Sequence, residues 1–168
     1  MSPKIFFVTG ICGSGKSTLA QILKKELFTA EVHDFDEGNM PEKADGNWRR
    51  QKTDYWLKKI QLHKDKITVI CGLCLPKEVK SLSFNRSIGV NYGYICITRE
   101  EMKRRLVKRG WGPKTINETI VLGRNLEKQV KSDSKVFIVD GEKNKPRELA
   151  EKVKVWINKT LSEHKAKQ

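Results

Sequence analysis

The chain of 168 residues lacks any long apolar run. Its mean hydropathy is −0.58, and no stretch approaches the roughly 18 consecutive apolar residues that a membrane-spanning helix needs. The apolar segment Lys4–Val8 is too short for the core of a secretion signal, and no small-residue cleavage site follows it. These absences predict a cytoplasmic protein without a membrane anchor or an export signal.

Cysteine is also scarce, with only Cys12, Cys71, Cys74 and Cys96 in the chain. A disulfide framework is unusual in an intracellular protein of this size. The spacing of Cys71 and Cys74 occurs in zinc and redox sites, but a zinc site needs a second pair of ligands, and the three histidines have no metal-ligand spacing. We therefore expect these two cysteines in a loop at the end of a buried strand.

Acidic residues are few compared with basic ones. The chain has 34 Lys and Arg against 20 Asp and Glu, a net charge of +14, and the excess is larger in its second half. Such a charge favours anionic partners, namely phosphorylated small molecules, nucleic acid or an anionic surface. A lysine-rich solvated surface would explain it equally well, and no Arg-Gly repeat or unbroken basic tract points to nucleic acid.

Short apolar runs alternate with helix-length segments along the whole chain, which indicates βαβ units and a parallel sheet. Neither an internal repeat nor a second-domain boundary interrupts this alternation, so residues 1–168 are predicted to form one domain. The expected strands are 4–9, 31–35, 67–71, 92–97 and 135–139. The expected helices are 16–28, 53–64 with Thr53 as its cap, one opening at Pro76, 100–109, one from Thr115 or Asn117 to 131, and 146–159. Residues 38–46 are expected to form a loop, and the tail from 163 to fray.

One motif carries specific chemistry: residues 10–17, Gly-Ile-Cys-Gly-Ser-Gly-Lys-Ser, match the phosphate-binding loop pattern G-x-x-x-x-G-K-[ST] in full. Glycines allow backbone N–H groups to converge on phosphate oxygens, and the helix N-terminus that follows favours anions. Lys16 is predicted to reach the β- and γ-phosphates of ATP, and the Ser17 hydroxyl to bind Mg²⁺. The predicted nucleotide-binding residues are Gly10, Cys12, Gly13, Ser14, Gly15, Lys16, Ser17 and Thr18.

Two carboxylates, Asp34 and Asp36, lie at the end of the second expected strand. The two-residue period of a strand puts them on one face, and strand ends in such sheets meet at the crevice where ligands bind. At that place the two carboxylates are suited to bind a Mg²⁺-bound water and the hydroxyl group of an acceptor. Asp34 is expected deeper, near Lys16 and the metal, and Asp36 nearer the acceptor. The alternative is a solvated acidic turn, and an acceptor that is itself a phosphate needs no base.

The loop at residue 10, the Asp-x-Asp at 34–36 and an arginine-rich helix before a glycine-containing segment resemble small P-loop kinases. That group includes nucleoside-monophosphate, shikimate and gluconate kinases, together with related AAA-type small-molecule kinases, and the resemblance covers about residues 4–158. It implies an α/β three-layer P-loop NTPase fold with a five-stranded parallel sheet of order 2-3-1-4-5. It also implies an acceptor-binding region at about 37–65 and a helical, mobile lid at about 110–118.

Arginines are expected at both of these regions. In the resembling kinases, lid arginines neutralise charge on the transferred phosphoryl group, and Arg105 and Arg109 share one helix face at the spacing i, i+4. Arg104 and Arg124 are further candidates, and a solvated basic helix is the alternative. In the acceptor-binding region, Trp48, Arg49 and Arg50 are candidates because arginine recognises phosphate or carboxylate with two parallel hydrogen bonds. Arg86 is a weaker candidate.

Asp140 follows an apolar strand, as a Walker B aspartate does, but the resemblance places its loop near the base of the nucleotide. A structural or base-edge role is therefore favoured over Mg²⁺ binding. No acidic residue ends the third expected strand, where Cys71 and Cys74 lie instead.

The sequence predicts an enzyme that uses ATP and Mg²⁺ to phosphorylate a small anionic or hydroxyl acceptor, such as a nucleoside, a nucleotide or another hydroxyl metabolite. A kinase for nucleic-acid 5′-hydroxyl groups and a non-catalytic ATP-binding module are the alternatives. A GTPase switch is disfavoured, because Asn144-Lys145-Pro146-Arg147 lacks the final Asp of the guanine-reading motif. The oligomeric state stays open.

Overall fold

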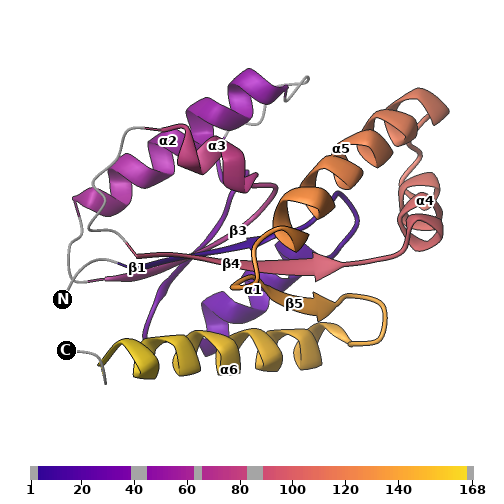
Figure 1. Ribbon diagram of the computed structural model, residues 1–168. Coiled ribbons are helices and arrows are strands. Elements are labelled where there is room, and N and C mark those ends of the chain that lie inside the picture. The colour runs from indigo at the N-terminus through magenta and orange to yellow at the C-terminus, as the bar shows by residue number, and fades with distance from the viewer. Residues whose placement is uncertain (1–3, 39–44, 63–65, 83–88, 166–168) are drawn as a thin grey trace.

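A parallel sheet of five strands runs through the centre of the molecule, as a computed structural model shows (Figure 1). The structure describes residues 4–38, 45–62, 66–82 and 89–165. The strands are β1 (Lys4–Thr9), β2 (Glu31–Asp34), β3 (Ile67–Cys71), β4 (Gly89–Cys96) and β5 (Phe137–Asp140). All neighbours pair in parallel, in the order β2-β3-β1-β4-β5, which confirms the predicted fold class and strand order.

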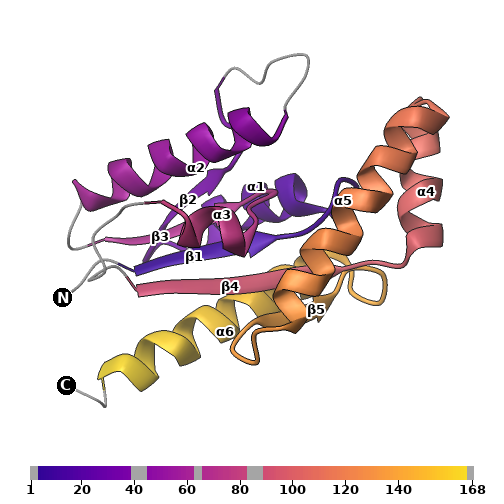
Figure 2. The same ribbon diagram turned by 45° about the horizontal axis from the view of Figure 1, so that its top comes forward.

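Helices cover both faces of this sheet, so the fold has three layers (Figures 1 and 2). They are α1 (Lys16–Glu26), α2 (Gly46–Gln61), α3 (Pro76–Lys80), α4 (Arg99–Lys108), α5 (Pro113–Lys131) and α6 (Pro146–Lys165). Helices α1 and α6 lie side by side on one face, whereas α2 and α3 lie on the other. Helices α4 and α5 stand together at one end of the molecule (Figure 2).

The side-chain alternation of β1 divides the hydrophobic core between these layers. Phe6 and Val8 pack with the side chains of α1 and α6, and Ile5 and Phe7 pack with those of α2 and α3. All four side chains are buried, and burying each one contributes about 1.5–3 kcal/mol. In a third cluster, side chains of α4 and α5 pack with Tyr94 of β4, and this packing holds the two helices against the sheet.

Helix α2 starts earlier than the sequence predicts. Asp45 caps it, with its carboxylate accepting a hydrogen bond from the Trp48 N–H at 2.8 Å, and the helix begins at Gly46. Thr53, the predicted cap, is instead a buried interior residue whose hydroxyl donates to the Arg49 carbonyl oxygen at 2.9 Å. The prediction of a helix start at 53 is therefore wrong, because a strong Asx cap follows the Pro- and Gly-containing segment. Of the predicted loop, residues 39–44 lie outside the described residues.

Helix α5 also starts earlier than predicted, at Pro113, with Gly112 as its cap. Proline suits the first helical position, where its missing N–H costs nothing. Most of the segment 110–118 is therefore helical rather than an exposed loop, and only residues 109–112 join α4 to α5. Gly110 makes this turn with a φ of +78°, a conformation that favours glycine.

The other bounds differ by a few residues. Strand β4 begins at Gly89 and not at 92, because its first, half-buried residues pair with β1, and β5 ends at Asp140. Helix α6 continues to Lys165, past the point where the sequence predicts fraying, and residues 166–168 lie outside the described residues. Among the helices described, none combines the length and the apolarity that crossing a bilayer requires.

Candidate active site

The carboxyl ends of the parallel strands meet at one edge of the sheet, and the phosphate-binding loop follows β1 there. Gly13 and Gly15 have φ values of +86° and +98°, which side chains with a Cβ rarely adopt. A Cβ at Gly10 would lie 2.5 Å from the Ser14 Oγ and 3.1 Å from the Ile95 carbonyl oxygen. The three motif glycines are therefore required by the shape of the loop itself.

Helix α1 begins directly after this loop, with Gly15 as its cap and with no side chain bonded to its N-terminal amides. Unbonded amides at a helix start attract anions. The side chains of Ser17 and Thr18 are exposed on this first turn. A hydroxyl in this position suits Mg²⁺, which keeps several waters and needs few protein ligands.

The Lys16 side chain bonds to other residues of the phosphate-binding loop. Its ammonium donates to the Ile11 carbonyl oxygen at 2.7 Å and lies 3.5 Å from the Ser14 Oγ. Burial lowers the pKa of Lys16, and the charges of Cys12, Asp36 and Asp34 oppose that shift. The lysine is therefore desolvated, and two carboxylates act on it from across the strand ends.

Asp34 and Asp36 are brought together at the end of β2. The Asp36 N–H donates to the Asp34 Oδ1 at 3.1 Å, and the side chain of Phe35 between them is fully buried. Partial burial raises the pKa of Asp36, and the nearby Asp34 raises it further, whereas Lys16 and Lys52 lower it. Lys16 and the two carboxylates thus share one electrostatic environment.

Asp34 is half-buried and Asp36 is exposed, in the order of depth that the sequence suggests. Both raise the pKa of Lys16, and Asp36 does so more strongly than Asp34. The assignment of Asp34 to the metal and of Asp36 to the acceptor stays a prediction. In the part of the chain that the structure describes, no three or more His, Cys, Asp or Glu side chains form a metal cluster. A Mg²⁺ ion held by Ser17, one carboxylate, phosphate oxygens and waters needs no such cluster.

A glycine positions this aspartate pair. A Cβ added to Gly72, in the loop after β3, would lie 1.9 Å from the Phe35 Cβ. The Phe35 N–H also donates to the Cys71 carbonyl oxygen at 2.8 Å. The sequence analysis gave Gly72 no role, because only the packing against Phe35 shows why the residue must be glycine.

The four candidate arginines on or near α4 and α5 lie in different surroundings. Arg105 donates to the carbonyl oxygens of Gly13 and Gly141. Arg104 is exposed and forms two hydrogen bonds of 2.6 Å with Glu101. Arg109, which follows the last residue of α4, and Arg124 on α5 are exposed, and among the described residues neither side chain has a hydrogen bond or an ion pair.

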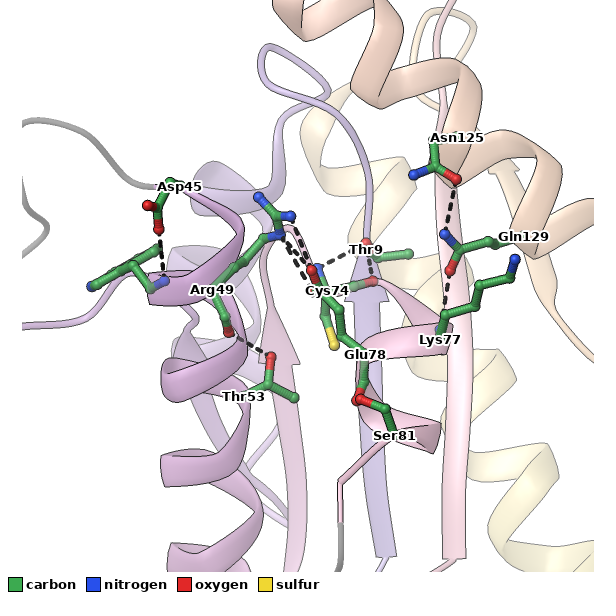
Figure 3. A network of polar contacts seen from close by, with 11 residues as sticks. Thr9, Asp45, Arg49, Thr53, Cys74, Lys77, Glu78, Ser81, Asn125 and Gln129 are labelled. Atoms are coloured by element: carbon green, nitrogen blue, oxygen red, sulfur yellow. Dashed lines mark hydrogen bonds and ion pairs between the residues drawn. The ribbon is translucent and has the colours of Figure 1, made fainter.

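In the region expected to bind the acceptor, Arg49 forms a half-buried ion pair with Glu78 of α3 (Figure 3). Its Nη2 lies 2.9 Å from the Glu78 Oε1, and its Nε donates to both carboxylate oxygens at 3.2 and 3.3 Å. Sequence reasoning missed Glu78, and no local pattern marks it as a partner for α2. Arg50 is exposed and Trp48 half-buried in the same helical turn, whereas Arg86 lies outside the described residues.

The same network reaches the base of the phosphate-binding loop (Figure 3). The Thr9 hydroxyl donates to the Cys74 carbonyl oxygen at 2.9 Å and accepts from the Cys74 N–H at 3.2 Å. On the other side of α3, the Lys77 N–H donates to the Gln129 side chain of α5 at 3.0 Å. Helix α3 therefore connects the strand before the loop with both α2 and α5.

Cys71 and Cys74 are buried, as expected for the end of a buried strand. Burial raises the pKa of the Cys71 thiol to about 12 and that of Cys74 above its ordinary range. Both remain thiols at neutral pH, so neither has the low pKa of a redox cysteine.

Asp140 accepts hydrogen bonds from the backbone N–H groups of Glu142 and Lys143, and these bonds lower its pKa. The Asp140 carboxylate therefore stabilises the loop between β5 and α6.

A complete phosphate-binding loop on a five-stranded parallel sheet of order 2-3-1-4-5 defines a P-loop NTPase domain, a class that binds nucleotides. Residues 6–132 match the sequence model of the AAA domain family AAA_18. The chain belongs to this family. A comparison with curated protein sequences finds no match.

Solved structures of small-molecule kinases share the fold. A shikimate kinase from Aquifex aeolicus is 21% identical, with 94% of this chain and 98% of that one covered and a TM-score of 0.64. A gluconokinase from Sinorhizobium meliloti is 16% identical, with coverages of 89% and 88% and a TM-score of 0.61. A deoxyadenosine kinase from M. mycoides is 16% identical, with coverages of 93% and 99% and a TM-score of 0.55. At these identities the likeness shows the fold alone.

Proposed function

We propose that the protein transfers the γ-phosphoryl group of ATP, with Mg²⁺, to a hydroxyl group of a small acceptor. One observation carries this proposal: the end of β2 lies level, across β3, with the end of the strand that leads into the phosphate-binding loop, since Asp34 is in register with Cys71 of β3 and Cys71 with Val8 of β1. Asp34 and Asp36 also favour the charged form of Lys16, the lysine of that loop. A binding module needs the loop and its lysine, but it does not require two carboxylates at a nearby strand end. The fold shared with shikimate and gluconate kinases supports the reading.

In the proposed reaction, the loop amides and Lys16 hold the β- and γ-phosphates, and Ser17 and Asp34 would hold Mg²⁺. Mg²⁺ neutralises phosphate charge when it is bound. Asp36 accepts the proton of the acceptor hydroxyl as the acceptor oxygen bonds to the γ-phosphorus. The bond from that phosphorus to the bridging oxygen breaks, and ADP leaves. A base in this position typically contributes 10²–10⁴-fold to the rate.

The whole chain acts as one domain in this proposal, with the acceptor between β2 and the first turn of α2. Arg50 and Trp48 are the proposed acceptor contacts, because Arg49 already binds Glu78. Arg109, an exposed arginine at the turn between α4 and α5, is the proposed contact for the transferred phosphoryl group. The proposed lid consists of this turn and the first residues of α5, within the expected helical lid at about 110–118.

A transfer screen with ATP labelled on its γ-phosphate tests the proposal. Nucleosides, nucleotides, sugars, hydroxy acids and 5′-hydroxyl oligonucleotides serve as acceptors, and Lys16→Ala serves as the inactive control. Labelled product from a small molecule, absent with Lys16→Ala, is the expected result. Nucleotide binding without transfer to any acceptor would favour the binding module.

Labelling of oligonucleotides alone would favour the nucleic-acid alternative. In that case, binding should weaken steeply with salt, by about 0.7 in log K per phosphate contact for each log unit of salt. A shallow salt dependence would contradict that alternative.

A further inference from the structure

The Arg105 side chain joins three segments that are far apart in the sequence. From α4, its Nη1 donates to the Gly13 carbonyl oxygen in the phosphate-binding loop at 2.9 Å. Its Nη2 donates to the Gly141 carbonyl oxygen in the loop between β5 and α6 at 3.3 Å. Its Nε donates to the Glu101 carboxylate, one helical turn back, at 2.6 Å. All three guanidinium nitrogens therefore have protein partners.

The contact with Gly13 restrains the most adaptable part of the phosphate-binding loop. Gly13 has a φ of +86°, and glycine backbone can rotate where other residues are restricted. The peptide between Gly13 and Ser14 is held at both ends, because its oxygen accepts from Arg105 and its N–H donates to the Ile11 carbonyl oxygen at 3.1 Å. Without Arg105, one of these two restraints would be lost.

Helix α4 also packs directly against the loop. A Cβ at Gly13 would lie 3.5 Å from the Arg105 Cβ and 3.8 Å from the Leu106 Cδ2. Glu101 holds the guanidinium from the other side, and its hydrogen bonds with Arg104 and Arg105 lower its pKa to about 2. The carboxylate is therefore ionised at neutral pH and remains a charged partner for Arg105.

We propose that Arg105 is a positioning residue of the nucleotide site, which keeps the phosphate-binding loop in shape and ties it to the β5–α6 loop. In this role its guanidinium stays on the two backbone carbonyls and does not contact the transferred phosphoryl group. The inference rests on the proposed function only in taking a nucleotide as the ligand of the loop. A preorganised loop binds phosphate more tightly because less ordering remains to be done on binding.

Three variants test this role: Arg105→Ala, Arg105→Lys and the matched control Arg104→Ala. Arg104 shares Glu101 and the helix with Arg105, but within the described parts of the chain its guanidinium bonds only to Glu101. Losing a charged hydrogen bond typically costs about 10-fold in affinity, so Arg105→Ala should weaken ATP binding about 10-fold in calorimetry. We expect Arg105→Lys to recover part of the affinity, since an ammonium can still donate to Gly13, and Arg104→Ala to bind as the wild type does.

The kinetic constants separate positioning from contact with the reacting phosphate. We expect Arg105→Ala to raise KM for ATP while kcat changes less than about 3-fold, because uniform binding is lost rather than transition-state binding. A loss in kcat of about 10³-fold with ATP affinity kept would overturn the proposal, since that is the size of effect expected for an arginine on the transferred phosphoryl group.

Hydrogen exchange without nucleotide keeps this test independent of the kinase proposal. The amides of residues 10–15 should exchange faster in Arg105→Ala than in the wild type or in Arg104→Ala, and unchanged exchange would overturn the positioning role. If Arg105→Ala does not fold, the same comparison is made with Arg105→Lys. If instead the wild type binds no nucleotide while the exchange result holds, the proposed function fails and the positioning role stands.

Discussion

The nucleotide side of the sheet edge and the side proposed for the acceptor, called the acceptor side below, are built in different ways. On the nucleotide side, a run of consecutive residues makes the site, and its internal hydrogen bonds are local, as between Lys16 and Ile11 or between Ser14 and Ile11. On the acceptor side, Arg49 of α2 depends on Glu78 of α3, and the loop before α3 depends on Thr9 of β1. The first side is a continuous motif, whereas the second is assembled from distant segments.

The difference follows from what each side must recognise. A triphosphate presents the same oxygens in every P-loop protein, so a short loop of fixed geometry is sufficient. An acceptor differs from one kinase to the next, and function resides in sites that are grafted onto a shared fold. A sequence motif can therefore identify the nucleotide side, while contacts between segments define the acceptor side.

The largest expected effect is on the nucleotide side. Lys16→Ala removes the charge nearest the phosphates, and we expect phosphoryl transfer to fall by at least about 10²–10³-fold, with weaker ATP binding. Transfer assays and calorimetry measure both quantities. Lys25→Ala, an exposed lysine on the same helix, is the control and should behave as the wild type does. Full activity in Lys16→Ala would contradict the kinase proposal.

The carboxylates form the boundary between the two sides. Asp36→Asn should lower transfer by about 10²–10⁴-fold with ATP affinity nearly unchanged. Asp34→Asn should instead raise the Mg²⁺ concentration required for half-maximal rate. Asp54→Asn, on α2 and paired only with Lys58 among the described contacts, is the control.

Rates measured across a Mg²⁺ series test this division of roles. Equal changes in Mg²⁺ requirement for Asp34→Asn and Asp36→Asn would show that the roles are not divided in this way. If neither substitution slows transfer, the acceptor is a phosphate that needs no base.

Gly72→Ala tests how the aspartate pair is held. The added Cβ would overlap Phe35, and overpacking of this kind costs about 1–3 kcal/mol or more of folding stability. Urea unfolding measures the loss. Gly89→Ala is the control, because its Cβ would meet only the Lys4 Cγ at an ordinary 3.7 Å. Equal stability of the two variants would contradict the packing argument.

The ion pair of the acceptor side is tested by Arg49→Ala. Removing the Arg49 guanidinium leaves the half-buried Glu78 carboxylate without its charged partner, which should lower the free energy of unfolding by about 2 kcal/mol. Arg50→Ala, one residue further along the same helix and exposed, should cost less than about 0.5 kcal/mol. The double variant Arg49→Met with Glu78→Leu should regain most of the loss, since no charge is then left unpaired. Additive losses in that variant would contradict the pairing.

The smallest expected effect is a change of stability with pH. In the folded protein, burial and Asp34 raise the pKa of Asp36. A carboxyl group whose pKa is raised by folding stabilises the folded state while it is protonated. This contribution to the free energy of unfolding is lost as the pH rises through the folded-state pKa. Asp36→Asn should therefore be slightly more stable than the wild type at pH 7, and the difference should disappear toward pH 3. A difference that grows as the pH falls would contradict the sign of this shift.

The sequence predicted the structure well where the pattern consists of consecutive residues. The phosphate-binding loop, the five strands and the proline that opens α3 are read from consecutive residues, because glycine, proline and apolar runs act on their own backbone. Helix starts were predicted less well. Asp45 caps α2, although the sequence suggests Thr53 as the cap. Pro113 begins α5, although the sequence suggests a start at Thr115 or Asn117.

By itself, the sequence determined the nucleotide side of this protein: eight consecutive residues specify a loop, a lysine and a hydroxyl, and their roles depend mainly on local geometry. Only the tertiary structure decided what the arginines contact. Arg49 was one of the candidates for an acceptor contact, and it forms an ion pair with Glu78. Arg105 was, with Arg109, a candidate for contact with the transferred phosphate, and its guanidinium donates to two backbone carbonyls. A guanidinium reaches several ångströms from its helix, so its partner depends on which segments the fold brings beside it.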